Sequence, residues 1–307
     1  MRRTALEMVH ELARRDPRIV FIGSDLGAGT LQAFRDEMPD RFFMEGVSEA
    51  NVIGMAAGLA MEGNIVYVNT IASFLTRRCF EQVALDLCLA RLPVRLIGNG
   101  GGLVYAPLGP THETVEDLAI LRALPNMTVL APADAGEMQR LMPCTVDHPG
   151  PVYIRLGKGG DPLVTDPAHP FVIGRAYPMR QGADALVVST GVCLGLALRA
   201  ADHLAEEGCS CGVLHVPTIK PFDADGLVRA AGDAAVVVTV EEHSIVGGLG
   251  GAVAEILCEA DFAGAKRMRR IGLADTFPEG YGSQAALMAR HGIDVPAIVD
   301  AVRALSS

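Results

Sequence analysis

Apolar and polar positions alternate along the chain in blocks that predict strands separated by helices. The strand-like segments of the first half are short, rich in β-branched residues and apolar on both faces: RIVFIGSD (18–25), NIVYVNT (64–70), VRLIGN (94–99), MTVLAP (127–132) and PVYIRLG (151–157). Parallel strands that are buried between two helix layers have this pattern. Helical stretches lie between them, over 48–62, 73–91, 114–123 and 133–146. The first half therefore predicts an α/β domain with a mostly parallel sheet.

The alternation stops at a segment that is rich in glycine and proline, and then resumes. Residues 157–182 contain five Gly and four Pro and lose the periodicity. After them, the pattern predicts strands over 185–190, 211–217, 234–243 and 268–275, and helices over 193–207, 223–231, 249–260, 283–290 and 294–305. We therefore predict two α/β domains with mostly parallel sheets, over residues 1–160 and 183–307, joined by a linker over 161–182.

Composition and charge narrow the range of partners. Half of the 307 residues are apolar, which is enough for two buried cores. The formal charge of −10 argues against a nucleic-acid partner, because phosphate binding needs a basic face. No apolar run reaches the length of a membrane span, and the first 17 residues read as an amphipathic helix rather than a signal peptide. We expect a cytoplasmic protein with no membrane partner.

Several familiar motifs are incomplete or misplaced. GNGGGL (98–103) lacks the last glycine of a dinucleotide-binding loop, and GCSCG (208–212) follows a helix and precedes a strand, which is the reverse of a nucleophile elbow. HETVED (112–117) has one His where a helical zinc pair needs two. The seven cysteines do not form paired C-x-x-C motifs. We expect free thiols and no metal site in this chain.

One acid stands at the start of a predicted helix, ahead of a run that has no charge. Glu49 follows Ser48 and precedes the uncharged run from Val52 to Met61. A helix that is apolar all round is buried, and an ionised carboxylate is costly there. Two interpretations follow from the residues alone: a Glu that stabilises the helix start after a Ser cap, or an acid that is kept for chemistry.

Polar residues also gather where predicted strands end, which is where open α/β sheets bind ligands. The segments are GSDLGAG (23–29), MEGVSEANVIGMAAGLA (44–60), SFLTRRCFEQ (73–82), GPTHETVEDLAILRALPNMTVLAPAD (109–134) and EEHSIVGGLGGAVAEIL (241–257). With these motifs in this order, the chain resembles the C-terminal half of transketolases and 1-deoxyxylulose-5-phosphate synthases over nearly all of its length. More distantly, it resembles the beta subunit of 2-oxoacid dehydrogenases.

The resemblance implies half of an active site. In this family the first domain binds the aminopyrimidine of thiamine diphosphate, and the second is a smaller C-terminal domain. The diphosphate and its Mg²⁺ or Ca²⁺ are held by another domain, which carries a GDG motif. This sequence contains no GDG. We therefore expect a partner chain, the N-terminal transketolase subunit with GDG, and an α2β2 assembly.

The resemblance assigns cofactor contacts to four residues of the first domain. Glu49 corresponds to the glutamate that hydrogen-bonds N1′ of the pyrimidine and so activates the thiazolium, and Phe74 to the aromatic ring that stacks on the pyrimidine. Leu26 matches the bulky apolar residue beneath the cofactor, with Asp25 as its polar neighbour. From the residues alone, Phe74 reads as a core residue, Leu26 as loop packing and Asp25 as a turn former.

The resemblance also implies substrate contacts. His112, in GPTH, resembles the histidine that faces the substrate carbonyl and its hydroxyl, and Arg155, in PVYIRLGKG, resembles an arginine that grips a substrate phosphate. Arg77 or Arg78 adds to this anionic site, and the spacing leaves open which of them does. The plain alternatives are a loop histidine and an arginine in a surface salt bridge.

One departure from the family pattern bears on specificity. Transketolases that act on sugar phosphates usually carry an Asp directly before GPTH, and this chain has Leu108 there. We predict a transferase subunit that moves a two-carbon ketol unit between anionic sugars, with an acceptor or donor other than a common pentose phosphate. The alternatives are the beta subunit of a 2-oxoacid dehydrogenase and a non-catalytic regulatory subunit.

Overall fold

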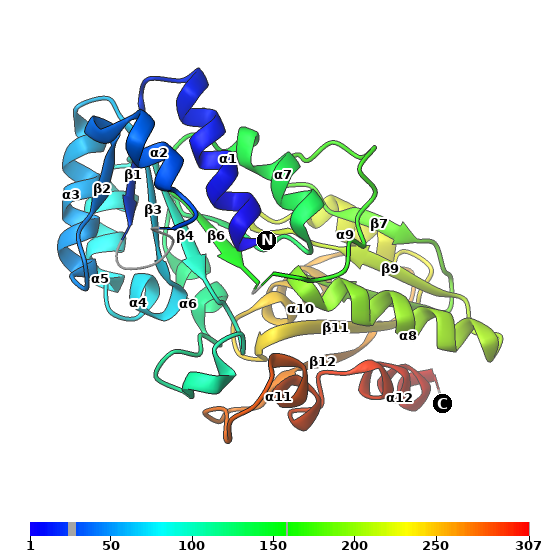
Figure 1. Cartoon of the computed structure of the whole chain (residues 1–307). Helices are drawn as coiled ribbons and strands as arrows, with labels where there is room; N and C mark the ends of the chain where they lie inside the picture. The colour runs from blue at the N-terminus through cyan, green and yellow to red at the C-terminus, as the bar shows by residue number, and fades with distance from the viewer. Residues whose placement is uncertain (24–28, 158, 307) are drawn as a thin grey trace. The chain divides into compact units, whose positions relative to one another are not determined.

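The computed structural model describes residues 1–23, 29–157 and 159–306, which form two compact units (Figure 1). The first unit consists of Met1–Gly101 and Ile120–Ile173, and the second consists of Gly102–Ala119 and Gly174–Ser307. The break after Ile173 falls inside the predicted linker. Among the described helices, none combines the length and the apolarity that a membrane span would require.

The first unit is built around a parallel sheet whose central strands are buried on both faces. Its strands are β1 (Ile19–Gly23), β2 (Phe42–Met44), β3 (Ile65–Ile71), β4 (Val94–Asn99), β5 (Thr128–Leu130) and β6 (Val152–Leu156). They lie in the order β5-β6-β4-β3-β1-β2, and their pairings are parallel. The predicted strands are all present, whereas the short edge strand β2 was not predicted.

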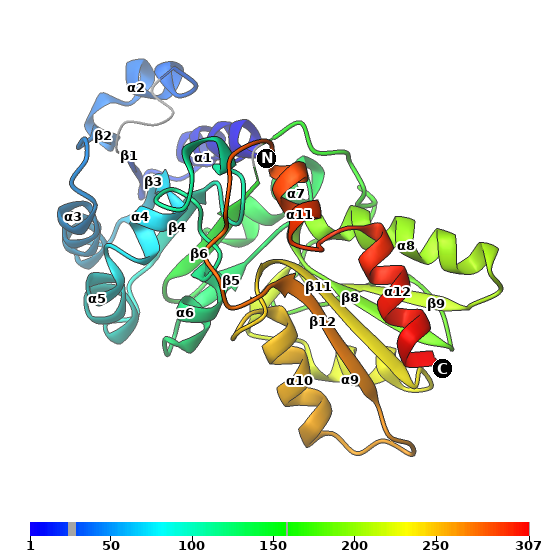
Figure 2. The ribbon, with the colours of Figure 1, turned by 90° about the horizontal axis from the view of Figure 1, so that it is seen from below.

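Helices cover both faces of this sheet (Figures 1 and 2). On one face, α1 (Arg2–Arg15) and α7 (Ala135–Cys144) pack side by side. The other face carries α3 (Glu49–Met61), α4 (Ala72–Thr76), α5 (Phe80–Gln82) and the π-helical segment η2 (Val83–Leu89). Two short helices, α2 (Gln32–Glu37) and η1 (Pro39–Arg41), precede β2. Because the strands are parallel, their carboxyl ends share one edge, from which the chain enters α3 and α4.

The predicted helix over 73–91 is wrong as a single helix, because the chain turns between α4 and α5. Thr76 donates its hydroxyl to the carbonyl of Ala72 at 2.8 Å, and the Cys79 thiol donates to the carbonyl of Phe74 at 3.2 Å. These two side chains bond backbone carbonyls where the helix is interrupted. The turn exposes the two arginines that follow Thr76.

The second unit has a sheet of its own. Its strands are β7 (Tyr177–Arg180), β8 (Ala185–Ser189), β9 (Cys211–His215), β11 (Val236–Ser244) and β12 (Arg267–Leu273), in the order β12-β11-β8-β9-β7. All pairings are parallel except that of β7, and a further short strand, β10 (Thr218–Lys220), follows β9. The predicted linker missed β7. This strand contains Pro178, which the outermost strand of a sheet tolerates.

Helices also cover both faces of the second sheet (Figure 2). One face carries α8 (Leu194–Glu206) and α12 (Val295–Ser306), and the other carries α9 (Ala224–Ala231) and α10 (Leu249–Glu259). The short helices η4 (Gly191–Cys193) and α11 (Gln284–Arg290) precede α8 and α12. The prediction of two α/β folds with mostly parallel sheets is thus confirmed.

The segment 102–119 joins the second unit through hydrogen bonds that are remote in sequence. It contains η3 (Ala106–Leu108) and the start of α6 (Asp117–Ala123). The Leu103 N–H donates to Glu242 Oε1 at 2.7 Å, and the Ser244 N–H donates to the Val115 carbonyl at 2.7 Å. Local periodicity carries no information about such long-range bonds.

Candidate functional site

Glu49 is the first residue of α3, and its side chain is buried, with 2% exposed. Ser48 does not cap the helix with its side chain, because its hydroxyl donates to the Glu45 carbonyl at 3.0 Å. A carboxylate that only stabilised the helix start could remain in water, where it costs nothing to solvate. The burial of Glu49 instead requires a partner for its charge.

Arg78 supplies that partner. Its Nη1 donates to Glu49 Oε2 at 2.7 Å, and its guanidinium carbon lies 4.2 Å from the centre of the Phe74 ring. The Arg78 side chain is 48% exposed. The turn after α4 therefore gathers a buried carboxylate, an aromatic ring and a half-exposed cation at the carboxyl edge of the first sheet.

This cluster suits the pyrimidine that the resemblance implies. An aminopyrimidine needs an acidic group at a ring nitrogen and a flat apolar surface beside it, and Glu49 and Phe74 both lie within contact of one guanidinium plane. Asp25 and Leu26, the other predicted cofactor contacts, lie outside the described residues. Among the residues that the structure describes, no group of three or more His, Cys, Asp or Glu side chains is arranged to hold a metal ion.

Two buried amides near the carboxyl ends of β3 and β4 were not predicted. Asn99 Nδ2 donates to Asn69 Oδ1 at 3.1 Å, and Asn69 Nδ2 donates to the Ile97 carbonyl at 3.2 Å. Within the part of the chain that the structure describes, the buried Asn99 Oδ1 has no hydrogen-bond partner. A buried acceptor without a donor is costly, so Asn99 can accept a hydrogen bond from a ligand. The signal in the sequence was a polar residue that closes an apolar strand.

The arginines that were predicted to bind an anion differ in burial. Arg155 lies in β6 opposite Gly98, is 7% exposed, and passes over Gly101 so closely that a Cβ there would overlap it. This position is not that of a surface salt bridge. Arg77 is exposed in the turn after α4, and its neighbour Arg78 is the arginine that reaches Glu49.

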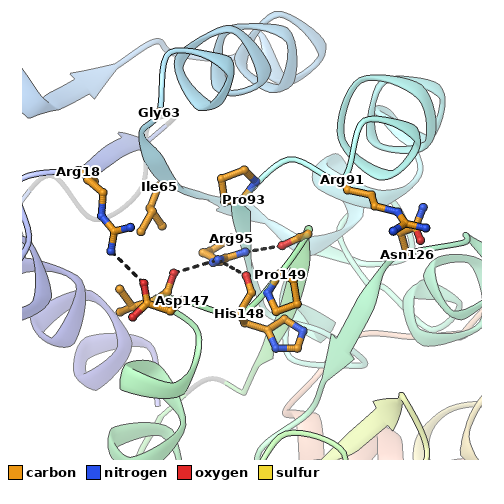
Figure 3. A pocket seen from close by; sticks show the side chains of 12 residues that line it. Arg18, Gly63, Ile65, Arg91, Pro93, Arg95, Asn126, Asp147, His148 and Pro149 are labelled. Atoms are coloured by element: carbon orange, nitrogen blue, oxygen red, sulfur yellow. Dashed lines mark hydrogen bonds and ion pairs between the residues drawn. The ribbon is translucent and has the colours of Figure 1, made fainter.

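A cavity of about 540 Å³ lies at the opposite, amino-terminal edge of the first sheet (Figure 3). Arg95 reaches into its wall and donates to the carbonyls of Val146, His148 and Gly150. Burial lowers the pKa of Arg95 to about 10, so the guanidinium remains charged at neutral pH. Its donors fix the loop that precedes β6. The contacts of this arginine are therefore structural.

A second cation that lines this cavity, Arg18, is also paired with carboxylates of the chain itself. Arg18 donates to Asp147 at 2.9 Å (Figure 3). It also donates to Asp16. A cation that is held by two carboxylates attracts an external anion only weakly. The cavity also lies away from the carboxyl edge, where α/β sheets bind ligands, and we assign it no function.

In the second unit, the GPTH loop presents His112 at a partly exposed position. The ring Nδ1 lies 2.9 Å from Thr111 Oγ1, and the ring meets Tyr105 edge-on with 6.4 Å between the centres. Gly109 begins the turn with a φ of 76°, a conformation that favours glycine, and the His112 N–H donates to its carbonyl at 3.0 Å. The turn therefore orients an imidazole that can donate to a substrate oxygen.

The neighbouring Glu113 was not predicted as a site residue. It is 1% exposed, and burial raises its pKa to about 7. An acid that titrates near neutrality can exchange a proton during a reaction. Its segment, HETVED, had been considered only for metal binding, and nothing local in the sequence indicates that this carboxyl is buried.

Two buried residues at the end of β11, Glu241 and His243, have structural partners. Glu241 accepts from the N–H groups of Leu249 and Gly250, each at 2.7 Å, at the start of α10. The Ala119 N–H donates to Nε2 of His243 at 3.3 Å, and Nδ1 of the same ring lies 2.7 Å from the Ser244 carbonyl. These residues hold the second unit together.

Comparisons with known proteins cover both units. Residues 1–160 match the family model of the transketolase pyrimidine binding domain, and residues 174–298 match that of the transketolase C-terminal domain. The chain is 37% identical over 302 residues to the 6-deoxy-6-sulfo-D-fructose transketolase subunit SqwH of Clostridium sp. (strain MSTE9), covering 98% of this chain and 92% of the relative. It is 41% identical over 295 residues to the 1-deoxy-D-xylulose-5-phosphate synthase of Syntrophotalea carbinolica, covering 95% of this chain and 46% of the synthase.

A solved structure gives the same result. A chain described as a split gene transketolase, inactive beta4 tetramer, matches with a TM-score of 0.91 and 36% identity, over 99% of this chain and 97% of that chain. The resemblance that the sequence motifs indicated is confirmed over both units. The chain therefore belongs to the transketolase family, as a split-transketolase subunit that corresponds to the C-terminal half of the full-length enzymes.

Proposed function

We propose that this chain is the pyrimidine-binding subunit of a two-chain transketolase that depends on thiamine diphosphate. The observation that carries the proposal is the buried Glu49 carboxylate beside Phe74 at the carboxyl edge of the first sheet. The match to 97% of a split gene transketolase chain and to 92% of a transketolase subunit supports a second chain. That partner, an N-terminal subunit with GDG, would hold the diphosphate with Mg²⁺ or Ca²⁺ in an α2β2 complex.

The chain's own residues then have defined tasks in the first domain. When bound, thiamine diphosphate supplies a carbon nucleophile that adds to the substrate carbonyl. Glu49 holds and exchanges the proton at ring nitrogen N1′, because a carboxyl group can both accept and return it. Phe74 offers the flat surface that orients the ring. The apolar surroundings of Glu49 in α3 exclude water from this proton.

The proposed substrate is an anionic sugar. His112 would donate to the oxygen on which negative charge develops, and Arg155 would bind the anionic end, since its planar fork of donors matches an oxyanion. Leu108, where sugar-phosphate transketolases usually have Asp, is 51% exposed and cannot bind a hydroxyl. One relative is described as acting on 6-deoxy-6-sulfo-D-fructose. The anionic end could thus be a phosphate or a sulfonate.

The alternatives receive less support. Both matched domain families are transketolase domains, which favours ketol transfer over the chemistry of a 2-oxoacid dehydrogenase. A regulatory subunit without chemistry would gain little from a buried carboxylate, because burial of that charge is costly.

Reconstitution tests the proposal. The chain is mixed with a GDG-containing N-terminal subunit, thiamine diphosphate and Mg²⁺, and assayed against ketose and aldose phosphates and sulfonates. We expect ketol transfer by the mixture and none by either chain alone. If the mixture binds the cofactor but transfers no ketol unit across the panel, the transketolase assignment is wrong.

A further inference from the structure

Arg78 makes the two contacts that the proposed pyrimidine would make. Its Nη1 lies 2.7 Å from Glu49 Oε2, and its guanidinium carbon lies 4.2 Å from the centre of the Phe74 ring. A guanidinium is planar, as an aminopyrimidine is, and its N–H reaches the carboxylate that would hold the proton shared with ring nitrogen N1′. The same acid and the same aromatic ring are therefore engaged by a side chain of the chain itself.

We propose that Arg78 is a placeholder for the pyrimidine, which the cofactor must displace from Glu49 and Phe74. This inference rests on the proposed function, because it takes these two residues as the pyrimidine site. Arg78 thereby sets the affinity of the assembled enzyme for thiamine diphosphate.

The burial of the partners shows which side chain moves. Arg78 is 48% exposed and stands in the turn between α4 and α5, so it can swing into water without disturbing the core. Glu49 is 2% exposed at the start of α3 and cannot follow. Phe74 belongs to α4 and stays with the sheet edge. Cofactor binding therefore replaces one arginine side chain by one planar ring at Glu49 and Phe74.

Arg78 also has a role in the chain before the cofactor binds. An ionised carboxylate that is buried without a cation destabilises a fold, and Arg78 neutralises Glu49 until another partner binds. The stacking of the guanidinium on Phe74 strengthens this closed arrangement. A ligand that binds only the open arrangement loses apparent affinity in proportion to the fraction of molecules that are closed.

The sign of one substitution separates this role from a binding role. If Arg78 bound the diphosphate or the substrate, removing its charge would weaken cofactor binding. If Arg78 is a placeholder, the same removal tightens it. Arg78→Met keeps an unbranched, flexible side chain but removes the charge, the N–H donors and the guanidinium that lies over Phe74. Arg35→Met, on the exposed surface of α2, makes the same change elsewhere and serves as the matched control.

The experiment is a calorimetric titration of thiamine diphosphate, with Mg²⁺, into the complex of this chain with its N-terminal partner. We expect Arg78→Met to lower the dissociation constant about 3- to 10-fold and Arg35→Met to leave it within about 2-fold. An unchanged or higher dissociation constant for Arg78→Met would overturn the placeholder role. If the wild-type complex did not bind the cofactor at all, the proposed function would fail first.

A second variant covers the case in which Arg78→Met does not assemble with the partner. Arg78→Lys keeps the charge for Glu49 but lacks the planar fork that stacks on Phe74, so it should close the site less completely. We expect a smaller decrease of the dissociation constant, about 2- to 3-fold. Equal or weaker binding by Arg78→Lys would overturn the proposal as well.

Discussion

Two buried glutamates, one in each unit, differ in the kind of group that pairs with their carboxylate. Glu241 is satisfied by the backbone N–H groups of Leu249 and Gly250, which cannot leave without unwinding the start of α10. Glu49 is satisfied by the half-exposed side chain of Arg78, which can leave by rotation about its own bonds. A buried charge whose partner is replaceable is prepared to bind something else. Burial alone does not distinguish the two acids.

The largest expected effect is on catalysis, from Glu49→Gln. The amide fills the same space but cannot exchange a proton, so ketol transfer by the reconstituted complex should fall about 1,000-fold. The free energy of unfolding should change by less than about 1 kcal/mol, because Arg78 can return to water. Initial rates and urea unfolding measure the two quantities. Turnover at the wild-type rate would remove Glu49 from the mechanism.

Glu241→Ala should show the opposite behaviour. The substitution leaves two buried N–H groups at the start of α10 without an acceptor, which should lower the free energy of unfolding by about 3 kcal/mol. Glu259→Ala, on the exposed end of the same helix, should cost less than about 0.5 kcal/mol and is the control. Urea unfolding measures both variants. If Glu241→Ala lost activity without losing stability, the contrast between the two acids would be wrong.

Glu113 is a further buried acid of the second unit. Burial raises its pKa from 4.5 to about 7 in the folded chain. An acid whose pKa is higher when folded loses its proton more readily when unfolded, so the free energy of unfolding should fall as pH rises from about 4.5 to about 7. We expect a decrease of about 2 kcal/mol from this residue. Urea unfolding of wild type and Glu113→Gln at pH 5 and pH 8 measures it, and equal pH dependence in both would contradict the assignment.

The smallest expected effect is on substrate binding, from Arg155→Lys. Arg155→Lys keeps the charge but loses the planar fork, so KM for the anionic sugar should rise about 10-fold with kcat little changed. Steady-state kinetics of the reconstituted enzyme give both constants. An unchanged KM would show that Arg155 does not hold the anionic end.

The sequence predicted the regular elements well because their signal is local. The strand predicted over 94–99 coincides with β4, and the helix predicted over 48–62 differs from α3 by one residue at each end. The motifs also identified the family. The helix over 73–91 was mispredicted because the hydrophobic pattern does not reveal the turn between α4 and α5, where the Thr76 hydroxyl and the Cys79 thiol bond backbone carbonyls.

Contacts between distant parts of the chain could not be predicted. The sequence left Arg77 and Arg78 equivalent, and only the turn after α4 shows which of them reaches Glu49. The attachment of 102–119 to the second unit depends on bonds such as that from Leu103 to Glu242, 139 positions apart. The buried amide of Asn99 was overlooked because one polar residue at a strand end has no distinctive period.

The most direct test of the half-site account is a pair of calorimetric titrations with thiamine diphosphate and Mg²⁺. One titrates the isolated chain, and the other titrates the chain with its GDG-containing partner. The account predicts no measurable binding to the isolated chain and saturable binding to the complex, lost in Glu49→Ala. Tight binding to the isolated chain would contradict it.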